Sequence, residues 1–145
     1  VNRTKRLIRT PRLFWCDTGL AAHLAGIESP LELNGGRMGG FLLENLVLLD
    51  LLAWAETRTP RPAITYWRTA TGEEADFVVE LKGKVIPIEI KSSRKPSLHD
   101  AVHLQSFMKE YGESSPLGLL LHNGTELERL AERIWAVPLG TALGL

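Results

Sequence analysis

Cysteine is nearly absent from this sequence. A single residue, Cys16, stands among 145, so no disulfide can form within the chain. One free thiol fits a protein of the reducing cytoplasm, and the cytoplasm is therefore the compartment that we predict. Because Cys16 ends the apolar run of residues 13–16, we expect a buried structural thiol rather than a nucleophile.

Long apolar runs are also lacking. No stretch approaches the roughly 18 consecutive apolar residues of a membrane helix. The nearest, residues 46–55, is interrupted by Asp50 and has the length of a core helix. The first residues lack the apolar centre of a signal peptide. We therefore predict no membrane partner, and because the chain opens with Val1 rather than methionine, we interpret it as a piece of a longer polypeptide.

Neither sign of charge is in excess, since 17 Lys and Arg residues balance 17 Asp and Glu residues. The exception is a basic N-terminal segment, residues 1–12, whose charged side chains are all positive: Arg3, Lys5, Arg6, Arg9 and Arg12. This segment either contacts phosphates or is simply solvated. With 44% hydrophobic residues, the chain 1–145 has enough apolar material for one domain with a core of its own.

The most informative stretch is residues 75–91, which predicts two antiparallel strands joined by a tight turn at residues 82–84. One face of this hairpin is apolar and must be buried; it carries Ala75, Phe77, Val79, Leu81, Ile86, Ile88 and Ile90. A turn centred on residues 82–83 places Asp76 opposite Glu89, and a turn centred on residues 83–84 places it opposite Lys91. In both registers Asp76, Glu89 and Lys91 share the other face.

Two carboxylates and a lysine on one strand face suit metal-dependent phosphodiester hydrolysis. Carboxylates bind hard divalent cations such as Mg²⁺ or Mn²⁺, and an ammonium can orient the attacking water or lower its pKa. The alternative is a half-exposed hairpin whose solvated face happens to carry Asp76, Glu89 and Lys91. Like charges that face each other across a ladder are destabilising, which weighs against that alternative.

The remaining patterns predict an α/β fold. Helices are expected at residues 18–25, 41–56, 97–111 and 126–133, a glycine-containing loop at residues 27–40, and strands at residues 64–69, 75–81, 85–92, 116–122 and 134–138. An antiparallel three-strand meander, a crossover helix and a further strand parallel to the meander give a mixed sheet flanked by helices.

Glu44 interrupts the apolar stripe of the helix predicted at residues 41–56. Its neighbours on the helix surface are Gly40, Phe41, Val47 and Leu48. An unpaired carboxylate buried among them would destabilise the fold by roughly several kcal/mol, or it would take up a proton. A metal or another cation is one candidate partner. A backbone hydrogen bond or an arginine such as Arg68 is the other, and both stay open at this point.

Several of these segments together resemble a known family. They are residues 11–14 and 17–20, residues 40–45 (Gly-Phe-Leu-Leu-Glu-Asn), residues 66–69 (Tyr-Trp-Arg-Thr), residues 74–78 (Glu-Ala-Asp-Phe-Val) and residues 88–93 (Ile-Glu-Ile-Lys-Ser-Ser). The pattern resembles the C-terminal uncharacterised domain of a family of prokaryotic AAA+-like ATPases, a domain that is similar to the PD-(D/E)XK nuclease superfamily. The resemblance spans nearly the whole chain.

The resemblance implies a restriction-endonuclease-like fold and a set of site residues. Asp76 and Glu89 correspond to the metal carboxylates, Lys91 to the lysine and Glu44 to the helix glutamate, while Ile90 offers a backbone carbonyl to the metal. The proline that the superfamily places before the first carboxylate is Ala75 here. The ATPase that the resemblance implies would lie upstream of Val1.

These observations lead to two hypotheses. The first is a Mg²⁺-dependent, or Mn²⁺-dependent, nuclease-like domain that acts on nucleic acid, with DNA favoured as the partner, and that is attached to an ATPase in the same chain. Its catalytic residues are Asp76, Glu89, Lys91 and Glu44, and Arg68, Lys95 and the N-terminal arginines contact phosphates. The second is a non-catalytic interaction or regulatory domain of that ATPase, which the zero net charge favours.

Overall fold

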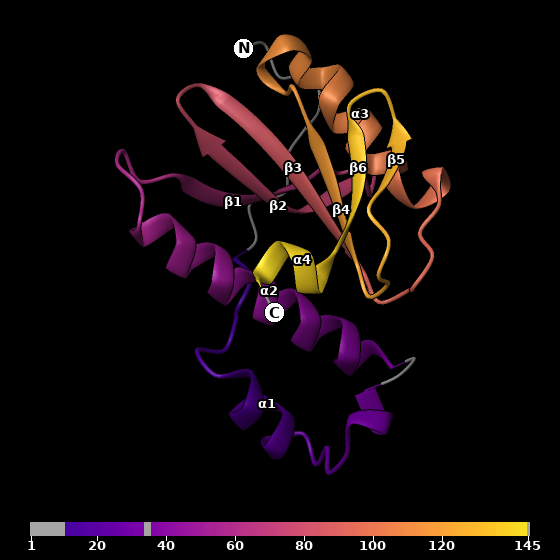
Figure 1. Ribbon diagram of the computed structural model, residues 1–145. Helices are drawn as coiled ribbons and strands as arrows, with labels where there is room; N and C mark the ends of the chain where they lie inside the picture. Colours follow the sequence, from indigo (N-terminus) through magenta and orange to yellow (C-terminus); the bar gives the residue numbers. More distant parts are fainter. Residues whose placement is uncertain (1–10, 34–35, 145) are drawn as a thin grey trace.

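A single mixed sheet of six strands forms the centre of the structure, a computed structural model that describes residues 11–33 and 36–144 (Figure 1). The strands are β1 (Ala63–Arg68), β2 (Glu74–Leu81), β3 (Lys84–Lys91), β4 (Gly118–His122), β5 (Glu128–Ala131) and β6 (Ile134–Pro138), in the spatial order β1-β2-β3-β4-β6-β5. The first three form an antiparallel meander, and β4 lies parallel to β3. The predicted meander, parallel strand and mixed sheet are confirmed.

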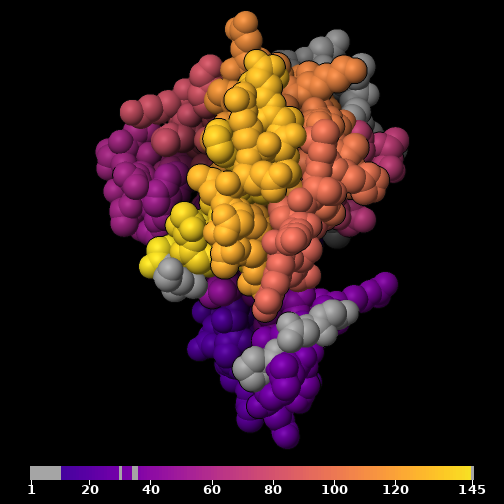
Figure 2. Space-filling model, turned by 45° about the vertical axis from the view of Figure 1, so that its right-hand side comes forward, coloured from indigo at the N-terminus to yellow at the C-terminus, as the bar shows by residue number. Residues whose placement is uncertain are grey.

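Helices cover both faces of this sheet. The N-terminal half contributes α1 (Thr18–Leu24), the 3-10 turn η1 (Pro30–Leu33) and α2 (Arg37–Glu56). The crossover from β3 to β4 contains η2 (Leu98–Ala101), α3 (Val102–Tyr111) and η3 (Gly112–Ser114), and α4 (Leu139–Leu143) ends the chain. Figure 2 shows the α1 end of the molecule protruding below the sheet.

Each face of the sheet has its own core. On one face Val47 of α2 and Leu139 of α4 pack with Phe77, Ile88 and Ile90. On the other face α3 supplies the helical side, where Phe107 packs with Trp67 and Val78, and Leu104 and Met108 pack with Leu120 and Ile134. Strands that are covered on both sides are buried along most of their length, and residues 75–79 of β2 are all buried.

The hairpin adopts the first of the two predicted registers. Phe77 pairs with Ile88, and Lys82 and Gly83 form the turn with positive φ angles of 50° and 75°. Two consecutive residues with positive φ are typical of the tight turn that matches the twist of a hairpin. Continued by one residue, this register sets Asp76 across from Glu89 rather than Lys91.

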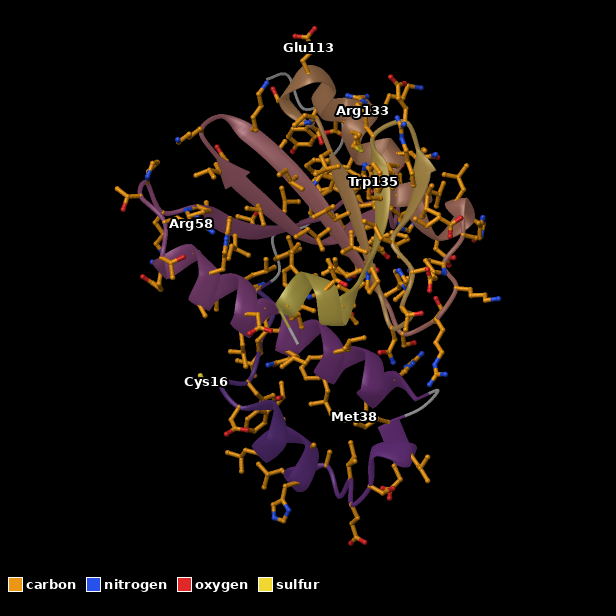
Figure 3. The ribbon with its side chains drawn as sticks, in the orientation of Figure 1. Cys16, Met38, Arg58, Glu113, Arg133 and Trp135 are labelled. Atoms are coloured by element: carbon orange, nitrogen blue, oxygen red, sulfur yellow. The ribbon has the colours of Figure 1, made fainter. Side chains whose placement is uncertain are left out.

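Three local predictions were wrong. Residues 126–133 contain no helix; β5 pairs antiparallel with β6 there, at the edge of the sheet. The helix α2 begins at Arg37, inside the predicted loop, because Gly39 lets its first turn approach η1: a Cβ on Gly39 would lie 2.0 Å from the Leu33 carbonyl oxygen. Cys16 is exposed, not buried (Figure 3).

The helix α2 is also the longest apolar element of the chain. Among the helices in residues 11–33 and 36–144, it alone has the length and composition of a membrane span, a property that core helices of soluble proteins share. In this fold α2 lies beside the sheet, with Val47 and Ala55 fully buried.

Asn45, on α2, fixes the chain that precedes α1. Its amide is fully buried, accepts a hydrogen bond from the Trp15 backbone N–H at 2.7 Å and donates one to the Trp15 carbonyl at 2.8 Å. Of the basic N-terminal segment, Arg12 is thereby held near α2, while Arg3, Lys5, Arg6 and Arg9 lie outside the described residues.

We predict that Asn45→Ala lowers the free energy of unfolding by about 1–3 kcal/mol, because it leaves two part-buried backbone groups without their partner. Urea unfolding followed by circular dichroism measures this. Asp50→Ala, at an exposed position of the same helix, is the control and should change stability by less than about 0.5 kcal/mol. Equal effects of the two substitutions would show that the Asn45 bridge carries no stability.

Candidate functional site

A bulge in β2 sets the position of Asp76. Thr65 of β1 pairs with Val78, but Trp67, two residues further, pairs with Ala75. Asp76 and Phe77 therefore both stand opposite the single residue Tyr66, so β2 carries the extra residue of a β-bulge. The bulge also moves Ala75 out of the face predicted for it, since Ala75 packs with Trp67 and Val78 on the α3 side. Bulges re-aim side chains in this way at many functional sites.

Asp76 is a buried carboxylate, with 7% of its surface exposed. Its Oδ2 accepts a hydrogen bond of 2.8 Å from the backbone N–H of Ile90. Burial, followed by the negative charges of Glu89 and Glu44, raises the pKa of Asp76 from 3.8 to about 8, against the opposing effects of the Ile90 N–H and of Arg12. At neutral pH the cation-free protein therefore holds a proton on this group.

Glu89 is the second buried carboxylate, with 5% of its surface exposed. It alternates along β3 with the core residues Ile88 and Ile90 and so lies on the α3 side of the sheet. Its Oε1 accepts a hydrogen bond of 2.8 Å from Lys91 Nζ, while its Oε2 is buried with no hydrogen-bond partner. Burial raises the pKa of Glu89, and the Lys91 hydrogen bond opposes the rise.

Lys91 neutralises part of this charge. Burial by itself lowers the pKa of Lys91, but the hydrogen bond and charge of Glu89, together with the charge of Asp76, outweigh it, so the pKa is raised. Lys91 is consequently an ammonium at neutral pH. About a third of the Lys91 side chain, 34%, is exposed, so the ammonium remains available to a ligand.

Glu44 joins the site from α2. It is close enough to raise the pKa of Asp76, and its Oε2 lies 2.5 Å from a terminal nitrogen of Arg12. Of the two partners considered for Glu44, an arginine is therefore present, but it is Arg12. Arg68 instead contacts Glu74, at 3.5 Å.

The alternative of a solvated hairpin face does not hold for the two carboxylates, because both are buried. The structure brings Asp76, Glu89 and Lys91 together and sets Glu44 beside Asp76. Sequence patterns did not single out Arg12 as a partner of Glu44, nor His103 of α3, whose charge acts on Glu89. For Arg12, the available signal in the sequence was a basic side chain two residues before Phe14.

The donor set of this site fits a hard divalent cation in part. Two buried carboxylates, one with an oxygen that lacks any hydrogen-bond partner, are the ligands that Mg²⁺ or Mn²⁺ prefers. Within residues 11–33 and 36–144, however, no group of three His, Cys, Asp or Glu side chains is arranged to hold a metal. A third carboxylate ligand would require Glu44 to exchange Arg12 for the cation. The backbone N–H of Ile90 donates a hydrogen bond to Asp76. The role of the Ile90 carbonyl as a metal ligand stays a prediction.

Comparisons with known proteins give a family and two relatives. A family model described as "Domain of unknown function (DUF4143)" matches residues 39–142. Two uncharacterized proteins, one from Mycobacterium bovis and one from Mycobacterium tuberculosis, are each 37% identical over 102 residues, or 67% of this chain. The chain spans about a fifth of their length, 21%. No solved structure matches.

We predict that Asp76→Asn stabilises the protein at pH 8 in the presence of EDTA. The native state keeps the Asp76 proton up to about pH 8, whereas the unfolded chain releases it near pH 3.8. The wild-type free energy of unfolding should therefore fall as pH rises from about 4 to about 8.

Asparagine cannot ionise, so the variant should exceed the wild type by at least about 1 kcal/mol at pH 8, and the margin should shrink toward pH 5. Urea unfolding at both pH values measures it. Glu80→Gln, on the exposed part of β2, is the control and should show no pH-dependent margin. A margin for Asp76→Asn that is the same at both pH values would contradict the raised pKa.

Proposed function

We propose that this chain, which belongs to the family described as a domain of unknown function (DUF4143), is a PD-(D/E)XK-like domain that hydrolyses phosphodiester bonds in nucleic acid with Mg²⁺ or Mn²⁺. The observation that carries the proposal is the buried pair Asp76 and Glu89 with Lys91 bound to one carboxylate and an unpartnered oxygen on the same carboxylate. Asp76 and Glu89 can both be ionised in this buried setting only if a further positive charge compensates them, and a bound divalent cation would supply that charge.

Asp76 and Glu89 would hold the cation, with the Ile90 carbonyl as a further ligand and Glu44 as a ligand once Arg12 releases it. When bound, such a cation would supply Lewis-acid chemistry, polarising a phosphoryl oxygen and lowering the pKa of the attacking water. Ionisation of Asp76 must accompany cation binding, because its proton occupies the same oxygens.

Lys91 would act on the water and on the phosphate. Because its pKa is raised, it is an ammonium, and we assign to it the orientation of the attacking water and the stabilisation of the charge that develops on the phosphate oxygens. Proton abstraction by Lys91 would need the opposite shift. The Nζ atom is already fixed by Glu89 at 2.8 Å, so little reorganisation is needed on substrate binding.

For the protein as a whole, we propose an accessory domain of an AAA+-like ATPase that acts on DNA in the cytoplasm. The relatives are about five times as long as the matching region, which leaves room for an ATPase in the same chain. Arg68, which pairs with Glu74 at the start of β2, and Lys95, four residues past the end of β3, are exposed basic residues that could contact phosphates.

A second candidate function is a non-catalytic interaction or regulatory domain of that ATPase. The Arg12 to Glu44 ion pair favours it, since it satisfies one site carboxylate without any metal, as does the zero net charge of the chain. The two candidates differ in whether the site binds a divalent cation, and the next two experiments separate them.

We predict that Mn²⁺ binds the wild-type chain in isothermal titration calorimetry and that Asp76→Asn and Glu89→Gln each weaken binding more than about tenfold, because each removes one of two buried anionic ligands. Both substitutions preserve side-chain shape, and circular dichroism confirms that the variants fold. Glu80→Gln is the matched control and should bind as the wild type does. A wild type that binds no Mn²⁺ would favour the regulatory function.

We also predict that the wild type cuts linear DNA with Mg²⁺ and that Lys91→Ala lowers the rate about 10²- to 10³-fold, the usual effect of removing one group that stabilises transition-state charge. Lys91→Ala should still bind Mn²⁺, which separates loss of catalysis from loss of the site. Lys84→Ala is the matched control, since Lys84 lies on the same strand and donates to the Glu113 carbonyl instead. A Lys91→Ala variant as active as the wild type would exclude the assigned role.

A further inference from the structure

An aromatic hollow of about 140 Å³ lies next to the candidate site. Three aromatic rings line it, those of Phe14, Tyr66 and Phe77, together with the side chains of Leu48, Ile64 and Arg12. The volume is close to the about 150 Å³ of the engineered cavity that takes up one benzene ring in another protein. One planar ring therefore fits this hollow.

Arg12 and two of the aromatic rings are already arranged around this hollow. The Arg12 guanidinium carbon lies 5.4 Å from the centroid of the Phe14 ring and 5.8 Å from that of the Tyr66 ring. The Phe14 ring packs against two further rings, with its centroid 6.4 Å from that of Phe41 and 5.9 Å from that of Phe77. The hollow is thus built on fixed side chains and carries one cation.

The hollow adjoins two of the site carboxylates, Asp76 and Glu44, through residues next to them. Phe77 directly follows Asp76 in the bulge, and Tyr66 is the residue that the bulge faces. From the other side Arg12 contacts Glu44, which lies one helical turn before Leu48. A molecule that contacts Asp76 and Glu44 can therefore also extend into the hollow, which lies beside the edge strand β1 and α2 (Figure 1).

We propose that this hollow binds one unpaired nucleobase of the substrate strand next to the bond that is cleaved, so that the domain acts on single-stranded or frayed nucleic acid. The inference rests on the proposed function and adds the substrate class to it. Proteins bind unpaired bases by stacking them on aromatic rings and arginine planes, and Tyr66 and Arg12 offer both. A base within a duplex is already stacked on both faces and could not enter.

The ring could come from DNA or from RNA, since stacking does not distinguish the two. Binding is measured in EDTA, where no cleavage occurs, by fluorescence anisotropy with four probes: a short thymidine strand, a uridine strand, an abasic strand of the same length and a blunt duplex. The abasic strand carries the same phosphates without bases. The wild type should bind the thymidine or the uridine strand at least about tenfold more tightly than the abasic strand.

Tyr66→Leu should remove this preference for bases, and Tyr66→Phe should keep it, because phenylalanine retains the ring. Trp135→Leu is the matched control. Trp135 is also half-buried, and the Arg129 guanidinium carbon lies 6.0 Å from the centroid of its ring. Trp135 stands on β6, however, four strands away from β1 in the order of the sheet (Figure 3). This variant should keep the preference, and thermal melting checks that all three fold.

Equal binding of the abasic and base-carrying strands by the wild type, preference for the blunt duplex, or an unchanged preference in Tyr66→Leu would each overturn the inference. If Tyr66→Leu fails to fold, loss of the preference in Tyr66→Phe would overturn it as well. The cleavage assay stands apart: DNA cleavage without a Tyr66-dependent preference overturns only the base site, and a Tyr66-dependent preference without cleavage overturns only the hydrolysis.

Discussion

The burial of two carboxylates at neighbouring positions, Asp76 and Glu89, is the constraint on which the site depends. Each has less than a tenth of its surface exposed, so water cannot stabilise both negative charges. Three kinds of compensation are available: a proton, a fixed cationic side chain or a bound cation. The structure shows the first two: burial raises the pKa of Asp76, and Lys91 donates a hydrogen bond to Glu89. The Glu89 oxygen without a partner shows where compensation is incomplete.

The fold produces this burial by covering the meander on both faces. The α2 side holds the hairpin in register, because Ile88 and Ile90 belong to that core and a slip by one residue would turn them toward α3. The α3 side then encloses Glu89, which alternates with them. The bulge of β2 opposite Tyr66 interrupts the alternation at Asp76, so that Ala75 turns to the α3 side. The same bulge sets Phe77 into the aromatic hollow, so one irregularity of the backbone shapes both the carboxylate site and its neighbour.

Sequence patterns could predict the structural features that depend on residues close together in the chain. The period of two in residues 75–91 gave both strands and the pairing of their apolar faces, and the tight turn left two registers of which one is observed. Burial of the polar face depends on α3, and the bulge depends on pairing with β1, so neither is visible in the hairpin alone. The edge strand β5 was mistaken for a helix because Leu127, Leu130 and Ala131 also fit a spacing of three and four. Arg12 and Glu44 are 32 positions apart, beyond any local pattern.

The Arg12 to Glu44 ion pair is compatible with cation binding, although it satisfies one carboxylate. About a third of the Arg12 side chain and a quarter of the Glu44 side chain are exposed, and ion pairs of that exposure contribute little, about 0–1 kcal/mol. A divalent cation held by Asp76 and Glu89 would act on Glu44 with twice the charge of Arg12, at a less solvated position. Glu44 can therefore change partner at small cost. Arg12 would then keep its contacts with the Phe14 and Tyr66 rings and could present its charge to a phosphate. The exchange that would complete the proposed metal site would thus also release a positive charge for the proposed substrate.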